Sequence, residues 1–279
     1  MTQTYLLVDW GYLFFYRYHA TKLWYKRAHD YLDDLTMADD PIFKKTIQKK
    51  VVDCIKEKMK KHKVEWCNVI VCRDTRRSDI WRNELHSDYK GNRDTSSLTG
   101  LKMTSSYLRE VIFDLLREHN VKCVGLKGAE ADDVIYVCKK RLSEVYPESK
   151  FVIVASDCDY YQIIDSNTSL VRLDKKDPMV KSTRNTHDFD IPKAQRIDLL
   201  VKIIQGDSSD NISSCFPKCG IKTALSLALD NEKLEKYLNR HEGSRDKLKY
   251  NSILIDMSNI PMELQQTITE KVNVCFNLS

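Results

Sequence analysis

Three acidic residues crowd the start of one apolar, helix-forming stretch of the chain. Glu130, Asp132 and Asp133 lie within four positions, and the residues that follow them have the spacing of a buried helix face. One interpretation is a helix N-terminus, where acidic side chains complement the helix dipole. The other is a metal site, where a cation neutralises the crowded negative charge. Acidic residues elsewhere in the sequence bear on this choice.

Such residues also follow the other segments that are typical of buried strands. In open parallel sheets, ligands bind beyond the carboxyl ends of the strands, so acids at successive strand ends would meet at one edge. Crowded carboxylates repel one another and must bind protons or cations. A set of oxygen ligands favours Mg²⁺ or Mn²⁺ over zinc. The set continues with Asp9, Asp74, Asp157, Asp159, Asp207 and Asp210.

Magnesium at such an edge has two common uses. Two ions roughly 4 Å apart form a phosphoryl-transfer site, in which one activates the attacking water and the other stabilises the leaving oxygen. A nucleotide-triphosphate site is the competing use. The sequence contains neither Gly-x-x-x-x-Gly-Lys nor Gly-x-Gly-x-x-Gly, and its eight glycines leave little material for a phosphate-cradling loop. The acids therefore predict a two-metal phosphoryl-transfer site.

A segment with basic and aromatic residues follows the second predicted strand. Arg82, Lys90 and Arg93 are separated by roughly two helical turns and then one, and Tyr89 stands beside Lys90. Cations here would bind phosphate and offset the charge that builds in the transition state. The aromatic ring would stack on an unpaired base. A surface ion-pair segment is the alternative, because acidic residues lie among the basic ones.

The elements that must position these side chains alternate along the chain. Short apolar stretches are typical of buried strands, and stretches with helical periodicity lie between them. This alternation predicts an α/β fold with a parallel sheet. The predicted strands are Tyr5–Val8, Asn68–Cys72, Val121–Val124 and Phe151–Ala155. The predicted helices between them are Phe43–Lys63, Ser105–His119 and Ala131–Val145.

The pattern becomes mostly helical from about residue 191. Pro192 suits the first turn of a helix, the stretch 206–219 reads as a loop, and further helices follow. The change predicts an α/β domain over residues 1–190 and a helical C-terminal region over residues 191–279.

Composition narrows the class of protein. Hydrophobic residues make up 42% of the 279 residues, which is enough for a core, and no run is long enough to cross a membrane. The net charge of +5 is too small to indicate nucleic-acid binding by itself. Nine scattered cysteines are typical of reduced thiols, and the close pair Cys215 and Cys219 lacks the partners of a zinc site. With no signal-peptide pattern, these features predict a cytoplasmic location and no membrane partner.

Taken together, the motifs resemble those of the structure-specific 5′ nucleases, the flap-endonuclease and 5′-3′ exonuclease family, and within it the phage enzymes called ribonuclease H. They occur in family order between residue 5 and about residue 225. The resemblance implies a PIN-like domain with a central, mainly parallel sheet flanked by helices. The matching stretches are Leu6-Leu-Val-Asp9, Trp81-Arg82 through Tyr89-Lys90-x-x-Arg93, Glu130-Ala-Asp-Asp133, Ser156-Asp-Cys-Asp159 and Gly206-Asp-Ser-Ser-Asp-Asn211.

The resemblance also implies roles for these residues. Lys90 and Arg93, with Arg82 nearby, would face the scissile phosphate from an arch over about residues 75–106, and a 5′ single strand would lie beneath it. Asp132 would be central to catalysis. One metal centre would comprise Asp9, Asp74, Glu130, Asp132 and Asp157, and the other Asp159 and Asp207, with Asp133 and Asp210 in support.

The stretch after residue 210 resembles a helix-two-turn-helix that grips duplex DNA. Gly220, Lys222 and Thr223 match its pattern and would contact the duplex. Cys215 and Cys219 replace glycines of the usual loop, which is also one residue shorter. This difference weakens the case for the potassium ion that often accompanies the element.

The implied function is Mg²⁺-dependent 5′-3′ exonuclease or flap-endonuclease activity on DNA and RNA–DNA replication intermediates, including RNA-primer removal, with Mn²⁺ as a substitute ion. A monomer is expected, with a single-stranded-DNA-binding protein and a sliding clamp as candidate partner proteins. Two alternatives stay open: another PIN-type ribonuclease that acts on structured RNA, and a DNA-junction-binding homologue without catalysis.

Overall fold

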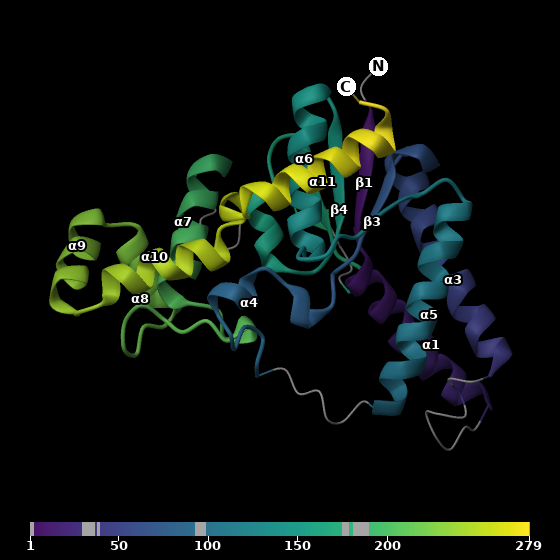
Figure 1. The fold of residues 1–279 in the computed structure, drawn as a ribbon, viewed down its shortest axis with the longest axis horizontal. Helices are drawn as coiled ribbons and strands as arrows, with labels where there is room; N and C mark the ends of the chain where they lie inside the picture. Colours follow the sequence, from purple (N-terminus) through teal and green to yellow (C-terminus); the bar gives the residue numbers. More distant parts are fainter. Residues whose placement is uncertain are drawn as a thin grey trace.

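A six-stranded sheet forms the centre of the chain, in the order β3-β2-β1-β4-β5-β6 (Figure 1). The computed structural model describes residues 3–29, 37, 40–92, 99–174, 179–180 and 190–278, with side chains left out for 99–107 and 179–180. Five strands are parallel, and β6 pairs antiparallel with β5. The strands are β1 (Thr4–Asp9), β2 (Val69–Cys72), β3 (Lys122–Val124), β4 (Lys150–Val154), β5 (Thr168–Val171) and β6 (Met179–Val180).

The first four strands confirm the prediction from apolar stretches. Periodicity does not predict β5, because its sequence Thr-Ser-Leu-Val opens with two hydroxyl residues instead of an apolar run. It also misses the helix α1 (Trp10–His29), in which aromatic side chains occur on nearly every face and blur the helical stripe. Both elements are therefore held by tertiary packing more than by a local pattern.

Helices cover both faces of the sheet (Figure 1). Leu6 and Val8 of β1 face a core shared with α1, α3 (Pro41–His62) and α5 (Thr99–Glu118). Tyr5 and Leu7 face the opposite core, shared with α6 (Ala131–Val145) and α11 (Met262–Phe276). Side chains alternate across a strand, so a strand buried on both faces reads as a continuous apolar run.

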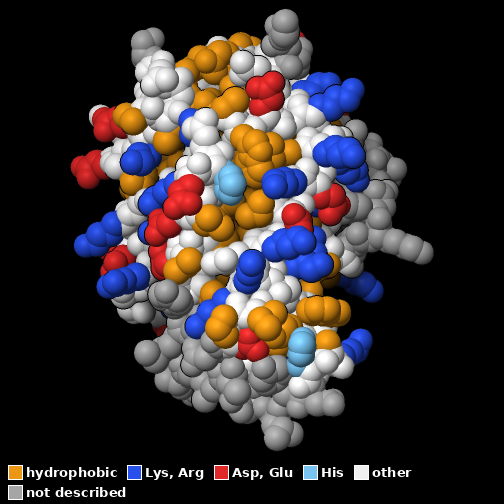
Figure 2. Space-filling view, turned by 90° about the vertical axis from the view of Figure 1, so that its right-hand side faces the viewer, with side chains coloured by type: hydrophobic (Ala, Val, Ile, Leu, Met, Phe, Trp, Pro, Cys, Tyr) orange, Lys and Arg blue, Asp and Glu red, His pale blue; other side chains and the backbone are white. Residues whose placement is uncertain are grey.

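The predicted helix over residues 43–63 is confirmed and begins slightly earlier. Asp40 caps it, because its Oδ1 accepts hydrogen bonds from the amides of Ile42 (2.7 Å) and Phe43 (3.4 Å), and Pro41 occupies the first turn. On the α3 side of the molecule, Figure 2 shows lysine and arginine side chains interspersed with apolar and acidic ones. The described part of this face therefore carries charges of both signs.

A second lobe consists of α7 (Ile191–Gln205), α8 (Ile221–Ala228), α9 (Asn231–Arg240) and α10 (Ser244–Ile255). It has its own apolar core, which includes Val201, Phe216, Leu227 and Leu238. The chain then returns to the sheet, where α11 packs against α6. The helical region that was predicted over residues 191–279 is thus split in space, because its last helix belongs to the sheet lobe (Figure 1).

Short elements complete the described fold: α4 (Arg82–Leu85) and the 3₁₀ helices η1 (Trp66–Asn68), η2 (Arg77–Asp79), η4 (Cys158–Ile163), η5 (Ser208–Asp210) and η6 (Met257–Asn259). The predicted arch over residues 75–106 contains only η2, α4 and the start of α5 as described helices, and residues 93–98 lie outside the described part. Among the described helices, none combines the length and apolar character that a membrane span requires.

Candidate metal centre

The ends of β1 and β2 position the first two carboxylates of the site, those of Asp9 and Asp74. Asp9 is the last residue of β1, and its carboxylate accepts hydrogen bonds from the Tyr12 amide (3.0 Å) and the Tyr160 hydroxyl (3.1 Å). Asp74 follows β2 and accepts one from the Ala131 amide at 2.9 Å. A Cβ at Gly11 would lie 3.2 Å from Oδ2 of Asp74 and 3.5 Å from Oδ1 of Asp9. The glycine thus lets α1 begin right beside two carboxylates that β1 and β2 bring together.

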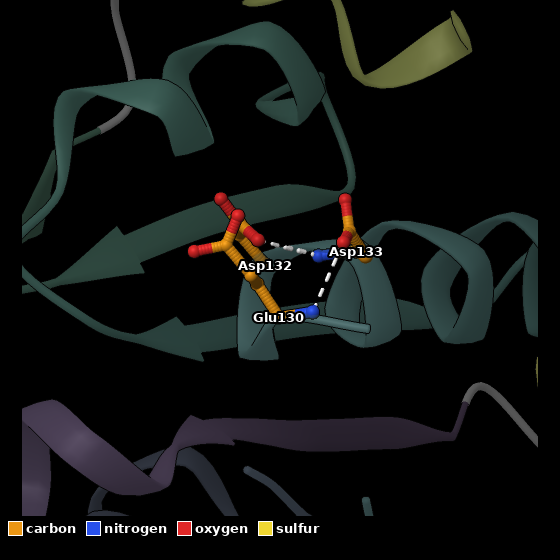
Figure 3. Close-up of side chains that lie close together, drawn as sticks. All are labelled: Glu130, Asp132 and Asp133. Carbon is orange, nitrogen blue, oxygen red and sulfur yellow. Dashed lines mark hydrogen bonds between the residues drawn. The ribbon is translucent and has the colours of Figure 1, made fainter. Parts of the chain in front are cut away.

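The acidic residues at the start of α6 fit both interpretations of the sequence, a helix N-terminus and a metal site. Glu130 is the N-cap of α6, and the Asp133 carboxylate accepts a hydrogen bond from the Glu130 amide (3.0 Å), which completes a capping box. Glu130, Asp132 and Asp133 also place ligand atoms within 4.8 Å of one another. Figure 3 shows Glu130 and Asp132 side by side, whereas Asp133 turns back toward the Glu130 amide. Capping therefore positions a potential ligand set.

Arg82 differs from its prediction. It was expected near the scissile phosphate, but only 3% of the residue is exposed. Its guanidinium pairs with Asp133 (2.9 Å) and Glu130 (2.8 Å), and its Nε donates to the Leu254 carbonyl (2.9 Å). Asp133 is fully buried and also accepts a hydrogen bond from the Trp81 indole at 3.1 Å. Arg82 therefore orients the Glu130 carboxylate, and Asp133 holds the Glu130 amide. Both supporting side chains are buried.

Tyr89 also differs from its prediction. It is 4% exposed, so its ring is not available to stack on a base. Its hydroxyl lies 3.0 Å from Oε2 of Glu130 and 2.9 Å from Oδ2 of Asp210. Lys90 forms an ion pair with Glu130, and its Nζ lies 3.8 Å from Oδ1 of Asp210. Tyr89 and Lys90 thereby join the acidic start of α6 to the loop that follows α7.

A second acidic group lies beyond this bridge. Asp159, Asp207 and Asp210 place ligand atoms within 4.8 Å of one another. Lys202 of α7 forms ion pairs with Asp159 and, at 2.8 Å, with Asp207. Ser209 adds hydrogen bonds to Asp207 from its amide (2.8 Å) and hydroxyl (2.6 Å). Sequence reasoning missed Lys202, because nothing in its neighbourhood marks one lysine of an amphipathic helix as the partner of two distant acids.

Electrostatics make both groups candidates for cation binding. Burial, together with the charge of Asp74, raises the pKa of Asp9 to about 7. Burial and the neighbouring Asp132 raise the pKa of Glu130 to about 7, even though Lys90 and Arg82 oppose the shift. Burial likewise raises the pKa of Asp159 to about 7 against the effect of Lys202. A cation at these oxygens would relieve the cost of ionising them.

Asp207 has the opposite shift. Burial opposes its ionisation, but Lys202 and the two hydrogen bonds from Ser209 lower its pKa to about 2. Lys202 therefore already supplies part of the positive charge that the second group needs. The donor set of carboxylate oxygens fits a hard divalent ion.

The other predicted residues lie around the two groups. Asp157 accepts a hydrogen bond from the Asp159 amide at 3.0 Å and lines a cleft of about 640 Å³ together with Asp159, Lys202 and Asp207. Arg93 lies outside the described residues. Three residues predicted to contact duplex DNA form the start of α8, where Gly220 and Lys222 are exposed and Thr223 is half-buried.

Comparison with known proteins places this geometry in a family. A sequence model of the 5′-3′ exonuclease N-terminal resolvase-like domain matches residues 4–190. The chain is 31% identical over 193 residues to a 5′-3′ exonuclease of Buchnera aphidicola, with 69% of this chain and 62% of the relative covered. It is 25% identical over 243 residues to the Ribonuclease H of Enterobacteria phage T4, with 80% of this chain and 75% of the relative covered.

Solved structures share the fold over nearly the whole chain. The phage T5 5′-exonuclease with bound zinc ions matches with a TM-score of 0.71 at 18% identity, over 98% of this chain and 99% of that chain. A phage T5 flap endonuclease in a pseudo-enzyme–product complex with DNA and metal ions has a TM-score of 0.72 at 18% identity, over 99% of this chain and 100% of that chain.

The curated relatives are longer than the matched part. The first three are covered over 62%, 56% and 52% of their own length, so the chain spans roughly half to two thirds of each. The domain model nevertheless covers more than half of this chain, including β1 to β6 and the acidic residues that follow the strands. The predicted family is confirmed: the chain belongs to the 5′-3′ exonuclease family, whose N-terminal resolvase-like domain it contains.

Proposed function

We propose that the chain is a divalent-metal-dependent 5′ nuclease that hydrolyses phosphodiesters near the junction of a 5′ single strand and a duplex. One observation carries the proposal: two groups of three carboxylates, one at the start of α6 and one from η4 and the turn after α7, each place ligand atoms within 4.8 Å of one another. Mg²⁺ is the proposed cofactor, with Mn²⁺ as a substitute, because both ions prefer oxygen ligands. A pair of such ions, when bound, supplies a hydroxide nucleophile and stabilises the leaving oxygen.

The protein's own contribution is to hold the carboxylates in place. The amide of Tyr12 and the hydroxyl of Tyr160 orient Asp9, and the amide of Ala131 orients Asp74. Arg82 orients Glu130 through an ion pair that is almost entirely buried. Rigid support of this kind is what a site needs if the reacting groups are to stay in register.

Two lysines are the proposed phosphate contacts. Lys90 and Lys202 each bridge carboxylates, and their side chains retain 15% and 25% exposure. Neutralisation of those carboxylates by cations would free the two ammonium groups for the scissile phosphate, where they offset developing negative charge. Arg93 stays a predicted phosphate contact. The burial of Arg82 and its pairing with Glu130 and Asp133 support a positioning role for it instead of a phosphate contact.

The proposed substrates are 5′ flaps and RNA primers on DNA replication intermediates. The relative in phage T4 is named for ribonuclease H activity, and the phage T5 structure contains DNA. Gly220, Lys222 and Thr223, at the exposed start of α8, are the proposed duplex contacts. A monomeric state, and recruitment by a sliding clamp or a single-stranded-DNA-binding protein, stay predictions.

Cleavage of defined substrates tests the proposal. A 5′-flap duplex, a nicked duplex and an RNA–DNA hybrid are incubated with and without Mg²⁺, and the products are mapped to the nucleotide. Asp132→Asn is expected to abolish cleavage and to leave flap binding largely intact, because it removes a ligand without removing a duplex contact. Asp114→Asn is a matched control, since this exposed aspartate of α5 forms a surface ion pair with the nearby Arg117, outside both acidic groups. Cleavage that survives EDTA, or that survives in Asp132→Asn, contradicts the proposal.

A further inference from the structure

A fully buried asparagine lies behind the second acidic group. Asn251 is on α10 and has no exposed surface. Its Nδ2 donates hydrogen bonds to the carbonyls of Ile203 and Ser213, both at 2.9 Å, and lies 3.5 Å from the Cys215 sulfur. Burying a primary amide is costly, and among the described residues only the Nδ2 end of this one is hydrogen-bonded, while its buried Oδ1 has no partner. The contacts of this side chain therefore indicate what it does in the fold.

Both carbonyls belong to the segment that carries Asp207 and Asp210. Ile203 is in the last turn of α7, and Ser213 lies where the following turn ends. The turn closes on itself, because Asp207 and Ile212 exchange two backbone hydrogen bonds of 2.8 Å each. Asn251 ties the beginning of this segment to its end.

The two ends of the turn approach each other closely at Gly206. Gly206 has a φ of 74°, and a Cβ there would lie 2.4 Å from the Ile212 carbonyl oxygen. Cys215 fixes the far end, since its amide donates to the Ile204 carbonyl at 2.9 Å. The amide of Asn251 reaches this turn from α10, while Asn92 and Tyr89 donate to Ser208 and Asp210 from the opposite segment.

We infer that Asn251 is a positioning residue that holds Asp207 and Asp210 in register with the rest of the metal centre. It acts through the carbonyls of Ile203 and Ser213, to which its Nδ2 donates, and not through a carboxylate of either acidic group. Without its two donated hydrogen bonds, the Ile203 carbonyl, which is buried, and the Ser213 carbonyl, at the exposed end of the turn, each lose a partner, and the turn gains alternative conformations.

The same helix braces the first acidic group. Tyr250 donates a hydrogen bond of 2.9 Å to the carbonyl of Leu85, the last residue of α4. The Leu254 carbonyl accepts one from Nε of Arg82 at 2.9 Å, and Arg82 pairs with Glu130. One helix of the second lobe thus contacts the supports of both acidic groups, so α10 links that lobe to the metal centre in addition to Lys202 of α7.

Amide hydrogen exchange on the metal-free protein tests the role of Asn251. Asn251→Asp keeps the shape of the side chain but points an oxygen at both carbonyls. The amides of Asp207, Ile212 and Cys215 are expected to exchange at least about 10-fold faster, while those of β1 and α6 stay unchanged. Unchanged exchange in the turn, or an equal increase throughout the chain, overturns the inference.

Two further variants keep the test decisive. Asn259→Asp is a matched control, because Asn259 also donates its amide to a carbonyl (Ser252, 3.0 Å) but is exposed. Asn251→Ala leaves space in which water can reach the carbonyls, so it is expected to fold and to accelerate the same amides by a smaller factor. The control should leave the turn as it is in the natural sequence, and an equal effect in both asparagine positions contradicts a specific role.

The catalytic consequence rests on the proposed function. If that function holds, Asn251→Ala raises the Mg²⁺ concentration for half-maximal cleavage about 10-fold and changes duplex affinity by less than about 3-fold. An unchanged Mg²⁺ dependence together with a lower melting temperature would show a merely structural role. If the natural sequence cleaves none of the substrates, the proposed function fails, while hydrogen exchange still decides whether Asn251 holds the turn.

Discussion

The two acidic groups use the same chemistry on different supports. Glu130, Asp132 and Asp133 share the first turn of α6, where a capping box and a buried arginine fix them. Asp159, Asp207 and Asp210 come from η4 and from the turn after α7, and Lys202 lies among them. The first group combines local helix capping with the distant Arg82, whereas the second has no such helix start and depends on contacts between segments that are distant in sequence. Variants that remove the support of one acidic group at a time test whether the two groups are held in these different ways.

The largest effect is expected from the buried support of the first group. Arg82→Met leaves Asp133 fully buried without its cationic partner. Breaking a buried ion pair by removal of one partner costs about 3–5 kcal/mol, so the free energy of unfolding should fall by that amount in a denaturant titration. Arg117→Met is the matched control, since Arg117 pairs with Asp114 on the surface, and a loss below about 1 kcal/mol is expected there. Equal losses in the two variants would contradict the distinction between buried and exposed pairs.

In the second group, a smaller effect is expected from replacing Lys202: metal binding should become tighter, while cleavage should become slower. Lys202→Met removes the ammonium that pairs with Asp159 and Asp207. Divalent ions should then bind this group more tightly, because no cation has to be displaced, while cleavage of a 5′ flap should slow about 10- to 100-fold through loss of a phosphate contact. Calorimetric metal titration and single-turnover cleavage measure the two changes. Weaker metal binding in this variant would contradict the idea that Lys202 occupies the place of a cation.

A pH dependence of the metal-free fold is also expected. Asp9 and Glu130 have pKa values raised to about 7, so the folded chain binds protons more tightly than the unfolded chain between about pH 4 and 7. Stability should therefore fall as the pH rises through this window. Asp207, with its pKa lowered to about 2, contributes stability that is present above about pH 4 and lost as the pH falls toward 2.

Chemical denaturation in EDTA and in Mg²⁺ at about pH 5.5 and pH 8 checks this prediction. Mg²⁺ should add more stability at the higher pH, because there the carboxylates are ionised and mutually repulsive. A metal-free fold that is more stable at pH 8 than at pH 5.5 would show that these carboxylates are not held protonated by their surroundings.

Sequence patterns predict the frame of the site well. Four strands are correct because strands buried on both faces are continuous apolar runs, and Ala131–Val145 is correct because its cap and its apolar stripe agree. The convergence of Asp9 and Asp74 follows from parallel pairing of β1 with β2 alone.

The supports of the site are harder to predict, because they are contacts across the chain. Arg82 and Tyr89 have the composition of a nucleic-acid-binding segment, yet both turn inward to meet acids that lie more than forty residues away. Lys202 and Asn251 sit in helices without any local sign of their partners. The periodicity of a sequence predicts which side chains share one face of a helix or strand. It does not predict which residues, distant in sequence, pack against that face.

Metal stoichiometry tests the central claim most directly. Mn²⁺ is titrated calorimetrically into the metal-free protein and into Asp132→Asn and Asp207→Asn, which each alter one acidic group. We expect two bound ions per chain in the natural sequence and the loss of one site in each variant. A natural protein that binds no divalent ion, or variants that bind ions as the natural protein does, would contradict the assignment of the two carboxylate groups as a metal centre.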